Sequence, residues 1–149
     1  MATTVSNGTL TVTVTEKLVL NGKDHGSTKK ITATGINEIS KRILTCATTG
    51  TQVYAGSTAA AFGTFVTNDV RYVRLTNLDD TNFVVLHLEG NSHYSQIAVP
   101  AGGVFFLTDV SSVFDNSSAV ASFSAEDITR IDVMANTAAC DIEIMVASA

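Results

Sequence analysis

The 149-residue chain has no tryptophan, a single proline and few charged residues. Asp, Glu, Lys and Arg make up 15% of the sequence, whereas about a quarter is usual in soluble globular domains. No apolar run approaches the roughly 18 to 20 residues that a helix needs to cross a bilayer. The segment Met1 to Gly8 has neither the cationic part nor the apolar part of a secretory signal. We therefore expect a protein that folds in a cytoplasm and does not bind a membrane.

Positive charge is also sparse, because nine Lys and Arg stand against fourteen Asp and Glu, for a net charge of −5. Binding to nucleic acid needs clustered cations that displace the counterions of the phosphate backbone. The nearest approach to such a cluster is the set Lys29, Lys30, Lys41 and Arg42, which is too small. We expect no nucleic-acid partner, and a partner surface that is neutral or basic.

The chain has two cysteines, Cys46 and Cys140, far apart in the sequence. No C-x-x-C spacing is present, and a metal site built on two thiolates would need two further ligands. Folding in a cytoplasm favours two buried, apolar thiols over a disulfide, which remains the alternative.

What the sequence does contain is alternation with a period of two. Leu10, Val12 and Val14 alternate with threonines, which is typical of a half-buried strand with a β-branched polar face. Similar patterns predict strands at 9–15, 18–20, 30–34, 39–47, 51–56, 71–76, 83–88, 94–99, 104–107, 128–135 and 140–146, with a short strand near 119–123. Residues 36–44 also fit two helical turns, but the strand over 39–47 is favoured; residues 57–63 are predicted to be a loop or a short helix.

The segment 71–88 carries the clearest hairpin pattern. An alternating strand is followed by the break Asn77-Leu78-Asp79-Asp80-Thr81-Asn82 and by the apolar run Phe83 to Leu88. Asn and Asp favour turns because their side chains hydrogen-bond the local backbone. We therefore predict that the strands on either side of the break pair with each other.

About ten short strands at a spacing of roughly 8 to 12 residues are typical of an all-β sandwich or barrel. We predict a single antiparallel β-sandwich, jelly-roll-like, over residues 9–149. Residues 1–8 would form a polar N-terminal arm that becomes ordered only on a neighbour. Weakly charged strands with small side chains also favour packing beside copies of the same chain.

Two groups of residues are candidate metal sites. His87, Glu89 and His93 lie close in sequence, and His87 and Glu89 share one face of their strand. A metal site on this face would need a third ligand from elsewhere in the chain, and the sequence does not identify one. An exposed polar face is therefore the preferred interpretation. Asp79 and Asp80, with Asn77 and Asn82, offer oxygen ligands for calcium, but their spacing does not match a calcium loop, and a turn explains them.

No pattern typical of an enzyme is found. The chain has no G-x-S-x-G, and His25, His87 and His93 lie in or near turns. Gly102-Gly103 precedes a strand rather than a helix, unlike a phosphate loop. Without tryptophan and with three tyrosines, the chain has few aromatic platforms for a sugar. We predict no catalytic residues, no cofactor and no metal.

Three parts of the chain resemble virion structural proteins of marine tailed bacteriophages, particularly those that infect cyanobacteria. They are Gly63-Thr64-Phe65-Val66 with 70–82, Leu20-Asn21-Gly22-Lys23 with Gly35-Ile36-Asn37-Glu38-Ile39, and the ending 137–148. The resemblance implies a non-enzymatic component of a virion, assembled in the host cytoplasm, and carries over no functional residues.

On this resemblance the leading expectation is a capsid decoration protein. Such a protein would form a trimer, bind the major capsid protein and stabilise the shell by bridging its subunits. The alternatives are a tail, fibre or head–tail accessory component of the virion, a host-glycan attachment module, and an enzyme of a type that the sequence does not reveal.

Overall fold

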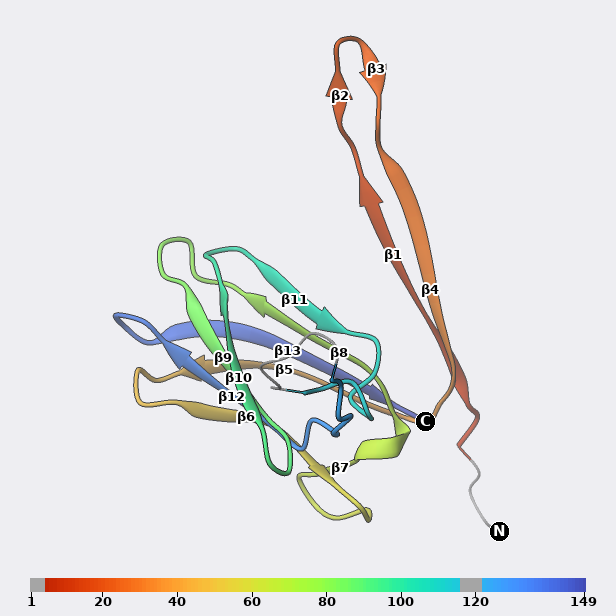
Figure 1. Cartoon of the computed structure of the whole chain (residues 1–149), viewed down its shortest axis with the longest axis vertical. Coiled ribbons are helices and arrows are strands. Elements are labelled where there is room, and N and C mark those ends of the chain that lie inside the picture. Colours follow the sequence, from red (N-terminus) through yellow and green to blue (C-terminus); the bar gives the residue numbers. More distant parts are fainter. Residues whose placement is uncertain (1–4, 116–121) are drawn as a thin grey trace.

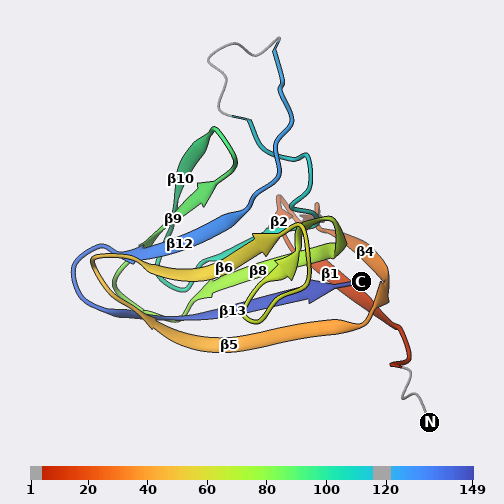
Figure 2. The ribbon, with the colours of Figure 1, turned by 90° about the horizontal axis from the view of Figure 1, so that it is seen from below.

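Strands dominate the computed structural model, which describes residues 5–115 and 122–149. Strands make up 59% of it and helix 2%. Between Glu38 and Ser148, two sheets lie face to face (Figures 1 and 2). The predicted all-β sandwich is confirmed. Alternation of apolar and polar residues explains it, because each strand can give one face to a core and the other to water.

The first sheet has the strand order β11-β8-β13-β5, and the second has the order β10-β9-β12-β6-β7. The first sheet contains β5 (Glu38–Cys46), β8 (Val70–Asn77), β11 (Val104–Leu107) and β13 (Cys140–Ser148). The second contains β6 (Thr51–Ser57), β7 (Phe65–Val66), β9 (Val84–Glu89), β10 (Tyr94–Val99) and β12 (Arg130–Ala135). Neighbouring strands are antiparallel except β6 and β7. A short 3-10 turn, η1 (Thr67–Asp69), connects β7 to β8.

The order of the strands is that of a jelly roll. Apart from the two-residue β7, the sandwich strands counted along the chain read 6-3-8-1 in the first sheet and 5-4-7-2 in the second. Consecutive strands therefore lie in opposite sheets, except β9 and β10, which form a hairpin. Two interlocked Greek keys of this kind define the double-sheet jelly roll.

The core lies between the two sheets. It is built from the inward residues of β8, β9, β12 and β13, whose burial alternates along each strand. Among the largest fully buried side chains are Leu75, Leu86, Ile131, Val133, Ile142 and Val146. Because alternate residues of both sheets meet in one layer, a change of register by one residue would expose this set to water.

The predicted hairpin between 71–76 and 83–88 is wrong. β8 lies in the first sheet and β9 in the second, so the chain between them crosses from one sheet to the other. β9 pairs with β10 and β12, and β8 pairs with β11 and β13. The turn-forming break is long enough either for a hairpin or for a crossing, so alternation and turn residues do not distinguish the two.

A second hairpin stands away from the sandwich (Figure 1). It consists of β1 (Gly8–Glu16) paired with β4 (Ser27–Ile36), and of β2 (Val19–Leu20) paired with β3 (Lys23–Asp24) at its tip. We call residues 8–36 the projecting hairpin. Its tip turns at Asn21 and Gly22, both with positive φ, as an Asn-Gly turn requires. Near Ile36, β4 contacts β8 and β13, and the rest of the hairpin extends outward.

The sandwich therefore begins at Glu38 rather than at residue 9, which was the expected boundary. Gly35 has a φ of 78°, a backbone conformation that suits glycine. It is the residue before the last one of β4, and only Asn37 separates that strand from β5. The sequence shows that residues 9–15 and 30–34 are strands, but it does not show which sheet they join.

Other local expectations can be checked in the same way. Residues 38–46 form strand β5 and not a helix, and residues 58–64 form a loop. The polar N-terminal arm predicted over 1–8 is described from Val5 onward, where residues 5–7 are exposed and belong to no strand. Most of the short strand predicted near 119–123 lies outside the described residues. No helix among the described residues is long and apolar enough to cross a membrane.

Candidate functional site

The Asn- and Asp-rich break after β8 links the two sheets. The side-chain amide of Asn77 is buried and donates to the carbonyl oxygens of Asn82, Pro100 and Val99, at 2.8, 3.1 and 3.3 Å. Its Oδ1 accepts a hydrogen bond from the backbone N–H of Asp79. A side chain at the end of the first sheet thereby holds the end of β10 in the second sheet. Sequence reasoning assigned Asn77 to a turn and missed this role.

The neighbouring carboxylates are occupied by the same turn. Asp79 Oδ1 accepts the backbone N–H groups of Asn82 and Thr81, which hold the pKa of this carboxyl below its usual value. Asp80 Oδ1 accepts the hydroxyl of Thr81. These contacts are the local backbone and hydroxyl bonds that make Asp favourable in turns. They agree with the turn interpretation that was preferred over a calcium site.

The histidines and Glu89 do not gather at one point. His87 lies on the outer face of β9, with its ring 5.6 Å from that of Tyr94 and its Nδ1 3.5 Å from Gln96. His93 lies in the turn after β9, and its Nδ1 is 2.9 Å from Glu126 Oε1. Among residues 5–115 and 122–149, no three His, Cys, Asp or Glu side chains are placed to share a metal ion.

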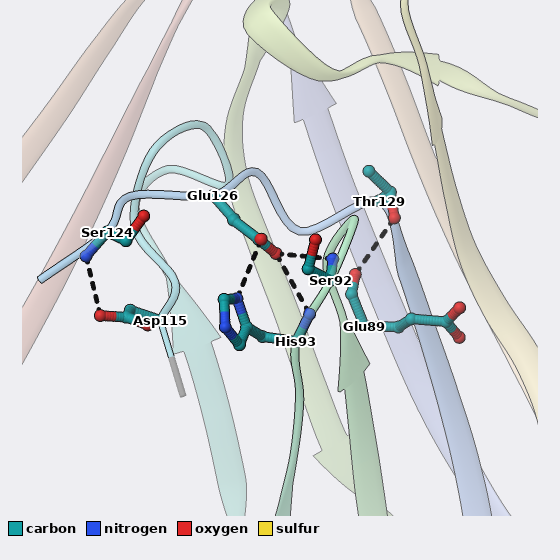
Figure 3. A network of polar contacts seen from close by, with 7 residues as sticks. All are labelled: Glu89, Ser92, His93, Asp115, Ser124, Glu126 and Thr129. Carbon is teal, nitrogen blue, oxygen red and sulfur yellow. Dashed lines mark hydrogen bonds and ion pairs between the residues drawn. The ribbon is translucent and has the colours of Figure 1, made fainter. Parts of the chain in front are cut away.

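Glu126 is the centre of a polar network that the sequence did not indicate (Figure 3). Its carboxylate accepts the backbone N–H groups of Ser92 and His93, at 3.0 and 3.3 Å, and pairs with the His93 ring. The N–H of Ser92 is the main reason that the pKa of Glu126 lies below its usual value. The network ties the β9–β10 turn to the segment before β12. Its geometry is that of a structural clamp on a loop.

The two cysteines are buried and unbonded to each other, as the preferred interpretation expected. Cys46 and Cys140 lie opposite each other on β5 and β13. Burial raises the pKa of Cys46 to about 11, and it also raises the pKa of Cys140. Since the thiolate is the reactive form, the raised pKa values favour the less reactive thiol form of both side chains.

The projecting hairpin has one apolar face and one polar face. In the register of β1 with β4, Leu10 lies opposite Ala33 and Val12 opposite Ile31. The other face consists of threonines and Lys30, including the pairs Thr9–Thr34 and Thr11–Thr32. At the tip, Leu18, Val19 and Leu20 are each more than half exposed. An apolar face of this kind normally packs against a core, and here the described part of the chain does not cover it.

The sandwich has an open side between β5 and β6. β5 is the last strand of its sheet, so one of its edges is unpaired among the described residues. A groove of about 470 Å³ separates β5 from β6, with Tyr54, Phe65, Ile144 and Val146 in its lining. Phe62 stands fully exposed at its rim. The projecting hairpin and this open side are the two features of the described fold that are suited to binding another molecule.

Comparison with known proteins adds little. No protein-family model matches the chain, and no curated protein matches it. A solved chain described as "Bacillus endospore appendages form a novel family of disulfide-linked pili" is similar at 13% identity and a TM-score of 0.44, covering 74% of this chain and 84% of that chain. A similarity this weak does not indicate a function.

Proposed function

We propose that the protein is a structural subunit of a bacteriophage virion, and more specifically a capsid decoration protein that bridges subunits of the outer shell. The projecting hairpin is the observation that supports this proposal. It places strands of nine and ten residues outside the sandwich, where they can reach a neighbouring molecule. The resemblance of several segments to phage virion proteins supplies the biological setting.

The projecting hairpin is energetically unfavourable in a protein that acts alone. A two-stranded sheet without a core is marginally stable in water, and the apolar face of this one is only half-buried among the described residues. Contact with a neighbour removes that face from water, at roughly 25 cal/mol for each Å² of apolar surface. A decoration protein needs such contacts and no catalytic chemistry, because its work is to add interface across the seams of a shell.

The distribution of charge gives the two parts of the molecule different partners. The hairpin carries four lysines and two carboxylates, a net charge of +2. The other residues carry five Lys and Arg against twelve Asp and Glu, a net charge of −7. The sandwich is therefore suited to neutral or basic patches of a capsid shell, and the hairpin to acidic surfaces.

The test uses particles of the bacteriophage that encodes the chain. Purified virions and isolated tailless heads are compared by quantitative mass spectrometry, with the major capsid protein as the internal standard. We expect the same ratio of this protein to the major capsid protein in virions and in tailless heads. That ratio should correspond to on the order of a hundred or more copies per head in a symmetric shell. Absence from heads, or a few copies that follow the tail proteins, would reject decoration in favour of a tail or fibre component.

A further inference from the structure

We infer that the projecting hairpin of one molecule pairs along the free edge of β5 in a second copy of the same chain, with the apolar face of the hairpin over the groove between β5 and β6. This inference deepens the proposed structural function by naming the partner of the hairpin. Both surfaces belong to this chain, and each lacks a partner in the part that the structure describes.

The donor surface is the projecting hairpin, in which β1 and β4 are already paired with each other. Both outer edges of the hairpin expose backbone N–H and C=O groups, because within residues 5–115 and 122–149 β1 and β4 pair with each other alone. Unpaired edges are templates for further strands. The apolar side chains Leu10, Val12, Val14, Ile31 and Ala33 share one face and are only half-buried, and Lys29, opposite Val14, lies on the same face.

The acceptor edge matches the hairpin in length. β5 has nine residues, as does β1, and β5 ends its sheet. On its outer face Ile39 and Ile43 are 63% and 65% exposed, which is unusual for an edge that has no partner. A hairpin added to this edge would extend the sheet, with its threonine face on the side of Ile39 and Ile43 and its apolar face toward Tyr54 and Phe65 in the groove. The same groove is also lined by Glu38, Ser40 and Arg42 of β5.

The pairing has to occur between molecules. A single residue, Asn37, separates β4 from β5, whereas an antiparallel hairpin needs a loop of about two residues or more. The backbone N–H of Asn37 also donates to the carbonyl of Ser148, which fixes the junction to the sandwich. The hairpin of a molecule therefore cannot fold back onto its own β5.

Electrostatics favours a copy of this chain as the partner. The hairpin has a net charge of +2, and the sandwich together with the short N-terminal segment carries −7. β5 itself carries Glu38, Lys41 and Arg42, a net charge of +1, so the attraction comes from the acidic remainder of the sandwich. Opposite net charges of this size increase the rate of encounter and disfavour approach of one hairpin to another. The same chain thus supplies the apolar face, the free edge and the complementary charge.

The first experiment compares matched variants on the two faces of β1. Val12→Asn changes the apolar face, and Thr11→Asn introduces the same residue next to it on the threonine face. Sedimentation velocity over a range of protein concentrations measures self-association. We expect Val12→Asn to weaken it about tenfold or more and Thr11→Asn to change it less than about twofold, as the loss of one buried apolar side chain predicts.

The acceptor side is tested with residues whose replacement cannot disturb the core. Phe62 at the rim of the groove and Phe123 in the segment before β12 are both exposed. We expect Phe62→Ser to weaken self-association and Phe123→Ser to leave it unchanged, with equal melting temperatures for both. Equal effects of the two variants, or a wild-type chain that stays monomeric at every concentration, would overturn the inference.

Photo-cross-linking identifies the contact directly. Val12 is replaced by p-benzoylphenylalanine, and cross-linked peptides are sequenced by mass spectrometry, with and without phage heads. We expect links between copies to residues 38–46, 51–57 or 61–65. Links between copies to other surfaces, or to a capsid protein alone, overturn the inference. Head binding by the same preparation reports separately on decoration, so loss of one result does not imply loss of the other.

Discussion

Asn77 connects the two sheets through hydrogen bonds of its side chain. Its amide satisfies three backbone carbonyls near the crossing from β8 to β9. A buried carbonyl without a hydrogen-bond donor loses its hydrogen bonds to water and forms none in the protein to replace them. The stability of this corner therefore depends on one polar residue within an apolar sandwich.

Replacement of Asn77 by Ala should lower the free energy of unfolding by about 2 to 3 kcal/mol, because buried polar groups lose their partner. The measurement is equilibrium unfolding in urea. Asn91→Ala is the matched control, since Asn91 is exposed in the β9–β10 turn, and its effect should stay below about 0.5 kcal/mol. Indistinguishable unfolding curves for the two variants would show that the Asn77 amide does not stabilise the crossing.

Glu126 should make stability depend on acid. Backbone N–H donation, first from Ser92, lowers its pKa in the folded chain from the ordinary value of 4.5. A carboxyl whose pKa is lower in the folded than in the unfolded chain stabilises the fold fully above its unfolded-state pKa. This stabilisation is lost as the pH falls through its folded-state pKa. Glu126→Gln should therefore be less stable than the wild type at about pH 6, and the difference should shrink at about pH 3.

Urea unfolding at the two pH values measures this difference. Glu89→Gln is the control, because Glu89 is a partly exposed carboxylate whose nearest cation, Arg130, is 4.0 Å away. Its effect on stability should be small at both pH values, as for other exposed ion pairs. If Glu126→Gln is less stable than the wild type by the same amount at both pH values, the carboxylate does not need its charge to hold the β9–β10 turn.

At the scale of elements, the projecting hairpin and the sandwich differ in what holds their strands. β8 and β13 are paired on both sides and bury one face in the core. In the part of the chain that the structure describes, β1 and β4 have one strand partner each and project away from the core of the sandwich. Local stability follows burial and pairing, so the two parts should open independently.

Hydrogen–deuterium exchange should resolve this difference. In dilute protein, where sedimentation shows monomers, amides of β1 and β4 should exchange about tenfold faster or more than those of β8 and β13, since a two-stranded sheet is marginal by itself. At concentrations where copies associate, protection should rise in 8–36 and in 38–46. Equal protection of hairpin and core strands in the monomer would mean that the hairpin is stable without a partner.

For the whole molecule, the separation of charge between hairpin and sandwich predicts an effect of salt. Self-association should weaken as ionic strength rises from about 0.1 M to about 1 M, because the screening length falls from about 10 Å to about 3 Å. Lys30 lies on the threonine face of the hairpin, so its replacement leaves the apolar face intact. Lys30→Gln should reduce the salt dependence, and Lys30→Arg should retain it. Association that strengthens with salt in all three proteins would indicate an interface without an electrostatic component.

Much of the strand content could be predicted, and the pairing could not. The alternation in 9–15 and 83–88 identifies strands, because side-chain direction along a strand depends only on neighbouring residues. The partner of each strand depends on residues far away in the sequence. This is why β8 and β9 were expected to pair with each other, and why the projecting hairpin was included in the sandwich.

The candidate sites divide in the same way. The turn role of Asp79 and the burial of Cys46 follow from local chemistry and from composition. The contact of Glu126 with Ser92 and His93 joins residues more than thirty positions apart, and no local pattern marks it. The groove between β5 and β6 exists because the jelly-roll order brings the edge strand β5 and the β6–β7 end of the second sheet to the same side.

The amino-acid sequence by itself determined that this protein is made of short strands with one apolar face each, that its turns lie at Asn, Asp and Gly, and that its charge is low and acidic. Each of these depends on local backbone preference or on simple composition. The tertiary structure decided which strands share a sheet, which apolar faces are buried, and which one, on the projecting hairpin, is left for another molecule. Burial depends on what the rest of the chain brings to a surface, and only the complete fold contains that information.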